Sequence, residues 1–201
     1  MNPLARAYVP AGALGRSAIE DAYGAAIAVG GDMVDGGFDD ERAASSHELL
    51  CLAGATLIEL AMIAQIFQAQ AQLDPDAVSQ ELKRDAKALR IASARMARLS
   101  RNALENHGRD TGYSLDVWLE HAFAETELLM TADSDPLFGG VETGAIELVR
   151  HLSDSLFSAL AATPTDRMGV PERVASAMGV SVALFMVADS HLRNEPRLRI
   201  V

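Results

Sequence analysis

The sequence predicts an all-α protein, a single helical-bundle domain over residues 1 to 201, and three observations lead to this fold class. Apolar residues recur every three to four positions over long segments. Clusters of Gly, Pro and Asp separate these segments. No segment alternates between apolar and polar residues for long enough to predict a strand. A chain of 201 residues can also bury one core without a disulfide or a structural metal.

The first half of the chain is predicted to contain one short and two long helices. An irregular lead over residues 1 to 15 precedes a short helix from 16 to 29, and the Gly- and Asp-rich segment 30 to 40 is predicted to be an acidic loop. Helical periodicity then covers 41 to 72 and 77 to 106, and the second pattern ends near His107-Gly108. Because only a short Asp-Pro-Asp break separates these two helices, we expect them to form an antiparallel hairpin.

Three further helices complete the predicted bundle. They cover residues 114 to 131, 141 to 162 and 171 to 193, and Pro171 falls in the first turn of the last one, where a missing N–H costs nothing. The prediction is therefore five main helices and a shorter N-terminal helix.

Charge and cysteine content restrict the class of protein. The net charge of −11 favours solubility and disfavours nucleic acid and anionic membranes as partners. Cys51 is the only cysteine, so an intramolecular disulfide is impossible and a reducing compartment is expected. The first twenty residues lack the apolar core of a secretory signal and reach Glu20 early. We therefore expect a cytoplasmic protein.

The segment 49 to 67, LLCLAGATLIELAMIAQIF, carries one charge in nineteen residues and is long enough to span a membrane. Glu59 in its middle, Gln65 near its end and the lack of flanking basic or aromatic anchors disfavour a span. A helix that is apolar on almost every side needs cover on every side. We therefore expect this helix to be surrounded by protein, as at the interface of a homodimer.

The segment 174 to 188, VASAMGVSVALFMVA, resembles the helix-turn-helix family over residues 171 to 190, with Gly179 at the turn. That resemblance implies a second helix whose outward side chains read DNA. The outward positions here hold Ser181, Val182, Ala183, Met186 and Val187, of which only the serine can bond a base edge. A core helix with Gly179 inside it explains the residues better, and a degenerate DNA-binding regulator is kept as an alternative.

The predicted helix 77 to 106 carries seven basic and three acidic residues, a net charge of +4, so the rest of the chain carries −15. This basic face, from Lys83 to Arg101, is expected to pair with acidic neighbouring helices or with a second copy of the chain. A surface that binds an anion or a phosphorylated ligand is the alternative.

Two carboxylates are the candidate catalytic residues. Glu59 shares a helix face with Met62 and Ile66, so it is expected to be buried and to need a partner or a raised pKa. An ion pair with an arginine of a neighbouring helix is its structural alternative. Asp189 lies on the side of Phe185, one turn before Arg193, and either forms an i,i+4 ion pair or lies at the rim of an apolar cavity.

Other combinations of residues give only weak support for a metal site or a catalytic site. The sequence has no Glu-x-x-His motif, and the pairs Glu147 and His151, and His121 and Glu125, lie off the apolar stripes of their helices. We therefore predict no metal site, and the sequence names no cofactor. His47 and Cys51 lie one turn apart, but no orienting Asn or Asp accompanies them, so Cys51 is predicted to be a buried thiol.

These observations lead to three hypotheses of function. The first is a protein that binds a small, largely apolar molecule in its core, with Glu59 and Asp189 as polar groups that orient the ligand or transfer a proton. The second is a non-catalytic, homo-oligomeric interaction or regulatory protein, and the third is the degenerate helix-turn-helix regulator. The predicted ligand-binding residues of the first hypothesis are Met62, Ile66, Trp118, Met178, Val182 and Phe185.

Overall fold

A computed structural model describes residues 16–34, 56, 58–67, 69–70, 80–132 and 170–193. This part of the chain is helical throughout, apart from the short turn between two of its helices, and contains no strand. The helices are α1 (Arg16–Val34), Ile58–Phe67, α3 (Gln80–Thr111), α4 (Leu115–Ala132) and α6 (Val170–Arg193). The predicted all-α fold class is confirmed.

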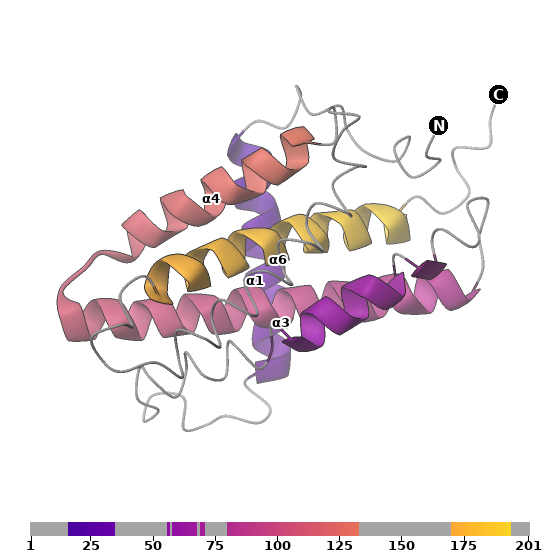
Figure 1. The fold of residues 1–201 in the computed structure, drawn as a ribbon, viewed down its shortest axis with the longest axis horizontal. Helices are drawn as coiled ribbons and strands as arrows, with labels where there is room; N and C mark the ends of the chain where they lie inside the picture. Colours follow the sequence, from indigo (N-terminus) through magenta and orange to yellow (C-terminus); the bar gives the residue numbers. More distant parts are fainter. Residues whose placement is uncertain are drawn as a thin grey trace.

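Helix α6 lies at the centre of this arrangement, between α3 and α4 (Figure 1). Helix α6 runs antiparallel to α3 and parallel to α4, and α1 runs across α3 and α6. The helix Ile58–Phe67 lies along α3, where Glu59 pairs with Arg95. At the other end of that helix, Phe67 contacts His191, close to the pair of Asp189 with Arg90. These contacts place helix Ile58–Phe67 antiparallel to α3, as expected of a hairpin.

The core forms where α6 meets its neighbours. Nearly every described side chain of α6 from residue 174 to residue 188 is buried, because helices cover it on several sides. A large apolar cluster joins α6 to helix Ile58–Phe67, α3 and α4, and a smaller one joins it to α1 and α3. Burying a large apolar side chain contributes about 1.5–3 kcal/mol, so α6 holds the bundle together.

Helix α6 is also the one described helix that is long and apolar enough to cross a membrane, over Pro171–Arg193. Within its most apolar window of 18 residues, 76 % is buried inside the protein. Core helices of water-soluble proteins have the same length and composition, so this feature is weak support for a span.

The alternative prediction of a helix-turn-helix over residues 171 to 190 is wrong. Helix α6 is continuous, and Gly179 is a helical residue inside it. The glycine is needed for a different reason: a Cβ at this position would lie 2.4 Å from the carbonyl oxygen of Ala122 in α4. The backbones of α4 and α6 therefore approach closely at Gly179, as the core-helix interpretation of this segment required.

Helix α1 extends further than expected and includes the start of the predicted acidic loop. Gly30 and Gly31 are helical, and α1 ends at Val34. A Cβ at residue 30 would lie 2.3 Å from the carbonyl oxygen of Ala94 in α3, so Gly30 also serves a close helix contact rather than a loop. The prediction of a loop over 30 to 34 is therefore wrong, and the rest of the predicted loop lies outside the described residues.

Helix α3 also ends later than expected, at Thr111 rather than near His107. The left-handed residue that ends the helix is Gly112, with a φ of 79°, and its N–H donates to the carbonyl of Gly108 over 2.7 Å. Ser114 then begins α4, because its hydroxyl oxygen accepts a hydrogen bond from the Asp116 N–H at 3.2 Å. This short turn sets the antiparallel arrangement of α3 and α4.

The helices predicted over 114 to 131 and 171 to 193 agree with α4 and α6 within one residue. The predicted lead over 1 to 15, the predicted helix 141 to 162, and the residues His47 and Cys51 lie outside the described residues.

Candidate functional site

Glu59 is not buried, contrary to the expectation from its apolar neighbours. Its side chain is 52 % exposed, and it accepts a hydrogen bond from Nη1 of Arg95 at 3.0 Å. The reason is that the described helices pack against the side of helix Ile58–Phe67 that carries Leu60, Ala64 and Phe67, and Glu59 does not lie on that side. Glu59 therefore forms an ion pair with an arginine of a neighbouring helix, which was the alternative to a buried catalytic role.

Asp189 is largely buried, at 16 % side-chain exposure, and lies between two arginines. It accepts a hydrogen bond from Nε of Arg90 in α3 at 2.9 Å and pairs with Arg193 one turn further along α6. The guanidinium of Arg90 also lies 5.2 Å from the ring centroid of Phe185. Asp189 thus joins α3 to α6 through its charge-assisted hydrogen bond with Arg90.

The predicted ligand-binding residues do not surround one cavity. Met178, Val182 and Phe185 are buried in the two core clusters. Met62 and Ile66, by contrast, are 60 % and 57 % exposed on the outer side of their helix. Side chains that face solvent cannot line an enclosed pocket together with side chains inside the core.

The sixth predicted residue, Trp118, is buried near the turn between α3 and α4. Its ring lies 6.3 Å from that of His107 and 6.4 Å from that of Tyr113, measured between centroids. It is also the only tryptophan in the sequence. Its indole N–H is buried and has no hydrogen-bond partner.

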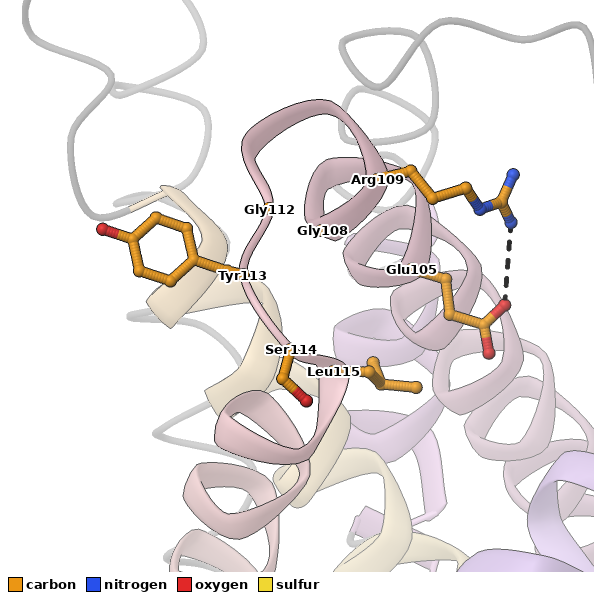
Figure 2. Close-up of a pocket in the computed structure, with 7 residues that line it drawn as sticks. All are labelled: Glu105, Gly108, Arg109, Gly112, Tyr113, Ser114 and Leu115. Carbon is orange, nitrogen blue, oxygen red and sulfur yellow. Dashed lines mark ion pairs between the residues drawn. The ribbon is translucent and has the colours of Figure 1, made fainter.

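A surface pocket of about 410 Å³ lies at this same turn (Figure 2). It is lined by Glu105, Gly108, Arg109, Gly112, Tyr113, Ser114 and Leu115. Both glycines belong to the bond that closes the turn, and a Cβ on Gly108 would lie 2.6 Å from the carbonyl oxygen of Tyr113. Gly108 therefore lets the chain fold back closely on the end of α3, and the pocket lies beside this turn.

The walls of the turn pocket combine charge with an exposed aromatic ring. Glu105 accepts a hydrogen bond from Nε of Arg101 at 2.9 Å, and Arg109 lies 4.0 Å from its other oxygen, at the limit of an ion pair (Figure 2). Tyr113 is mostly exposed. Of the two glycines that close this turn, Gly108 was placed near a helix end from the sequence and Gly112 was not singled out, and the pocket itself was not predicted.

The basic face of α3 is paired in part with acidic side chains. Arg90 pairs with Asp189, Arg95 with Glu59, and Arg101 with Glu105. The first two of these pairs join different helices. These contacts agree with the expectation that the face pairs with neighbouring helices, and they leave fewer cations for an anionic ligand.

No cluster of three or more His, Cys, Asp or Glu side chains suited to a metal ion occurs among the described residues. His121, one half of a geometrically possible pair with Glu125, instead shares a hydrogen bond of 2.9 Å with the hydroxyl of Ser176. The pair Glu147 and His151 lies outside the described residues.

Three further buried polar atoms among the described residues have no hydrogen-bond partner, namely the hydroxyls of Tyr23 and Ser100 and Nε of Arg98. The hydroxyl of Tyr23 in α1 makes no hydrogen bond, and its ring packs edge-on against Phe123 of α4 at 5.6 Å. Burial raises the pKa of Tyr23 to about 12. The group is therefore neutral at physiological pH and adds no charge to any site.

Exposed large apolar side chains gather on two helix faces. Ile58, Met62 and Ile66 follow each other at intervals of four residues along helix Ile58–Phe67, with 40 %, 60 % and 57 % exposure. On α4, Val117 and Leu128 are exposed in the same way. Such patches on a protein surface are typical of contacts with other molecules.

Comparison of the chain with protein-family models, with curated proteins and with solved structures found no match.

Proposed function

We propose that this protein is a non-catalytic helical bundle that acts by associating with protein chains, its own copies included. The observation that carries this proposal is the exposed row of Ile58, Met62 and Ile66. Three large apolar side chains on successive turns of one helix leave a continuous apolar strip in water, and covering that strip with another protein is favourable.

The two carboxylates selected from the sequence support the same proposal. Glu59 and Asp189 are each held by arginine, at 3.0 Å and 2.9 Å. Each carboxylate is thus already engaged by a charge-assisted hydrogen bond from a side chain of a neighbouring helix. The pairs therefore favour a structural role over proton transfer, and the continuity of α6 removes the argument for DNA binding that the sequence offered.

The proposal is tested by measuring the mass of the protein in solution over a wide concentration range. Sedimentation equilibrium is expected to show a reversible oligomer, and the melting temperature is expected to rise with protein concentration, because dissociation and unfolding are then coupled. A single monomeric species at every concentration, with a melting temperature independent of concentration, contradicts self-association.

A second candidate function is the binding of a small molecule in the turn pocket. The observation that favours it is the volume of about 410 Å³, which lies within the range of known ligand sites, beside the exposed ring of Tyr113.

Native mass spectrometry of gently purified protein tests this second candidate. A bound molecule is expected in the wild type and is expected to be lost from Tyr113→Ala, while Leu128→Ala, which changes an exposed apolar residue elsewhere, retains it. A wild-type mass equal to that of the bare chain, or a bound molecule that survives Tyr113→Ala, contradicts binding at the turn.

A further inference from the structure

The pocket at the turn between α3 and α4 is lined by two groups of opposite charge, Glu105 and Arg109 (Figure 2). They lie one helical turn apart on α3, and Nη2 of Arg109 is 4.0 Å from Oε2 of Glu105. A hydrogen bond between a guanidinium and a carboxylate is about 2.7–2.9 Å long. The two groups are therefore close without being bonded, and each can still bond a third molecule.

The rest of the protein leaves part of both groups unused. Oε1 of Glu105 accepts a hydrogen bond from Nε of Arg101 at 2.9 Å, whereas Oε2 has only the longer contact with Arg109. The side chain of Arg109 is 66 % exposed and makes no hydrogen bond with the described residues. The pocket thus offers one carboxylate oxygen as an acceptor and one guanidinium as a donor.

The other walls of the pocket are suited to an apolar group. Leu115 lines it together with Tyr113, whose side chain is largely exposed, and the two glycines add backbone without side chains. Figure 2 shows Arg109 and Tyr113 on opposite sides of the turn. A molecule in the pocket therefore meets charge at one end and an aromatic ring at the other, and about 410 Å³ is room enough for a small metabolite.

The charges favour a molecule that carries both signs. A simple anion is repelled by the net charge of −11 and by Glu105 in the same wall. A simple cation meets a carboxylate that Arg101 already pairs, with Arg109 beside it. A zwitterion avoids both costs, because its carboxylate can accept from Arg109 while its ammonium donates to Oε2 of Glu105.

We propose that the turn pocket binds a zwitterionic α-amino acid with an apolar or aromatic side chain. Arg109 binds the carboxylate, Glu105 binds the ammonium, and the side chain of the ligand lies along Leu115 toward Tyr113. This inference rests on the second candidate function and deepens it, because it names the chemical class of the ligand and the residues that recognise it.

Trp118 provides the signal for a direct test. It is the only tryptophan in the chain, and its ring centroid lies 6.4 Å from that of Tyr113 in the pocket wall. Titration of the whole chain with L-phenylalanine or L-leucine is expected to change the tryptophan fluorescence saturably, and equilibrium dialysis measures the same binding independently. Two analogues of phenylalanine, 3-phenylpropanoate without the ammonium and phenethylamine without the carboxylate, are each expected to bind about 10-fold more weakly or worse.

Arg109→Gln tests the recognition of the carboxylate. It is expected to weaken the binding of L-phenylalanine by about 10-fold or more, and it is expected not to weaken that of phenethylamine, which has no carboxylate. Arg84→Gln is the matched control, because Arg84 is an exposed arginine of the same helix outside the pocket. This variant is expected to bind L-phenylalanine as the wild type does, and circular dichroism checks that both variants are folded.

The outcomes separate this inference from the second candidate function. Equal binding of L-phenylalanine by Arg109→Gln and the wild type overturns the inference. A molecule that native mass spectrometry finds in the wild type and not in Tyr113→Ala, together with no binding of either amino acid, overturns the inference and leaves a ligand at the turn standing. A bare chain that binds neither amino acid overturns both.

Discussion

Replacing Gly179 by alanine tests whether α4 and α6 depend on a close backbone approach. Gly179 is helical, so alanine alone should improve the helix by about 1 kcal/mol. The added Cβ, however, would lie 2.4 Å from the carbonyl oxygen of Ala122 and 2.8 Å from the Cβ of Glu125. Ordinary carbon to oxygen contacts are about 3.3–3.6 Å, so α4 must move away by roughly 1 Å.

The expected cost follows from what that movement disturbs. Inserting a methyl group into a packed contact costs about 1–3 kcal/mol. Thr126 also donates a hydrogen bond to the carbonyl of Gly179 at 2.9 Å, and losing a buried bond of this kind costs about 1 kcal/mol. After subtraction of the gain in helix propensity, Gly179→Ala is expected to destabilise the fold by about 1–3 kcal/mol, which lowers the melting temperature by roughly 2–10 °C.

Gly24 in α1 is the matched control. It is also a helical glycine, but it is exposed, and a Cβ there meets no atom within 4 Å. Gly24→Ala is expected to raise the melting temperature by about 2–4 °C, because only helix propensity changes. Both variants are melted at the same protein concentration and followed by circular dichroism. If Gly179→Ala is as stable as the wild type or more stable, the close approach of α4 to α6 is refuted.

The remaining predictions concern single polar contacts. Tyr23→Phe is expected to leave stability equal or raise it by up to about 1 kcal/mol at neutral pH, because it removes a buried hydroxyl that has no partner. Because the pKa of Tyr23 is about 12 in the fold and about 10 when unfolded, the wild type loses stability as pH rises from about 10 to 12. Denaturant titrations at several pH values should show a smaller loss in the phenylalanine variant, and equal losses contradict the assignment. Arg90→Ala is expected to cost about 1–3 kcal/mol in chemical denaturation, because it leaves a largely buried Asp189 with one exposed partner, whereas Arg193→Ala should cost under about 1 kcal/mol. Equal effects of the two arginine variants would show that burial does not distinguish the pairs.

The fold class and most described helices could be predicted from the sequence because they depend on local patterns. Period-3.6 apolar spacing and Pro171 place α6 within one residue of its observed bounds. The errors fall at glycines. His107-Gly108 was taken as a helix end and Gly30 as the start of a loop, yet both glycines are helical, and it is Gly112 that takes the left-handed conformation. A glycine that ends a helix and one that admits a neighbouring backbone look the same in a sequence.

The candidate sites could be predicted less well, because they depend on how many sides of a helix its neighbours cover. The segment around Glu59 is apolar on nearly every side, so burial was the natural expectation, and the similarly apolar segment 174 to 188 of α6 is indeed nearly all buried. What separates the two helices is position. Helix α6 has α3 on one side and α4 on the other, whereas helix Ile58–Phe67 is covered along one side and exposes Met62 on the other.

That difference in position also bears on the use of apolar residues in this chain. Met62 and Ile66 contribute nothing to the buried core, and each leaves more than half of its surface in water. A folded monomer gains no stability from such a strip, whereas covering it with another protein contributes about 25 cal/mol for every Å² of apolar surface removed from water. The same residues that were selected as a ligand-binding lining therefore have a physical use on the outside of the bundle, provided that another protein chain lies against them.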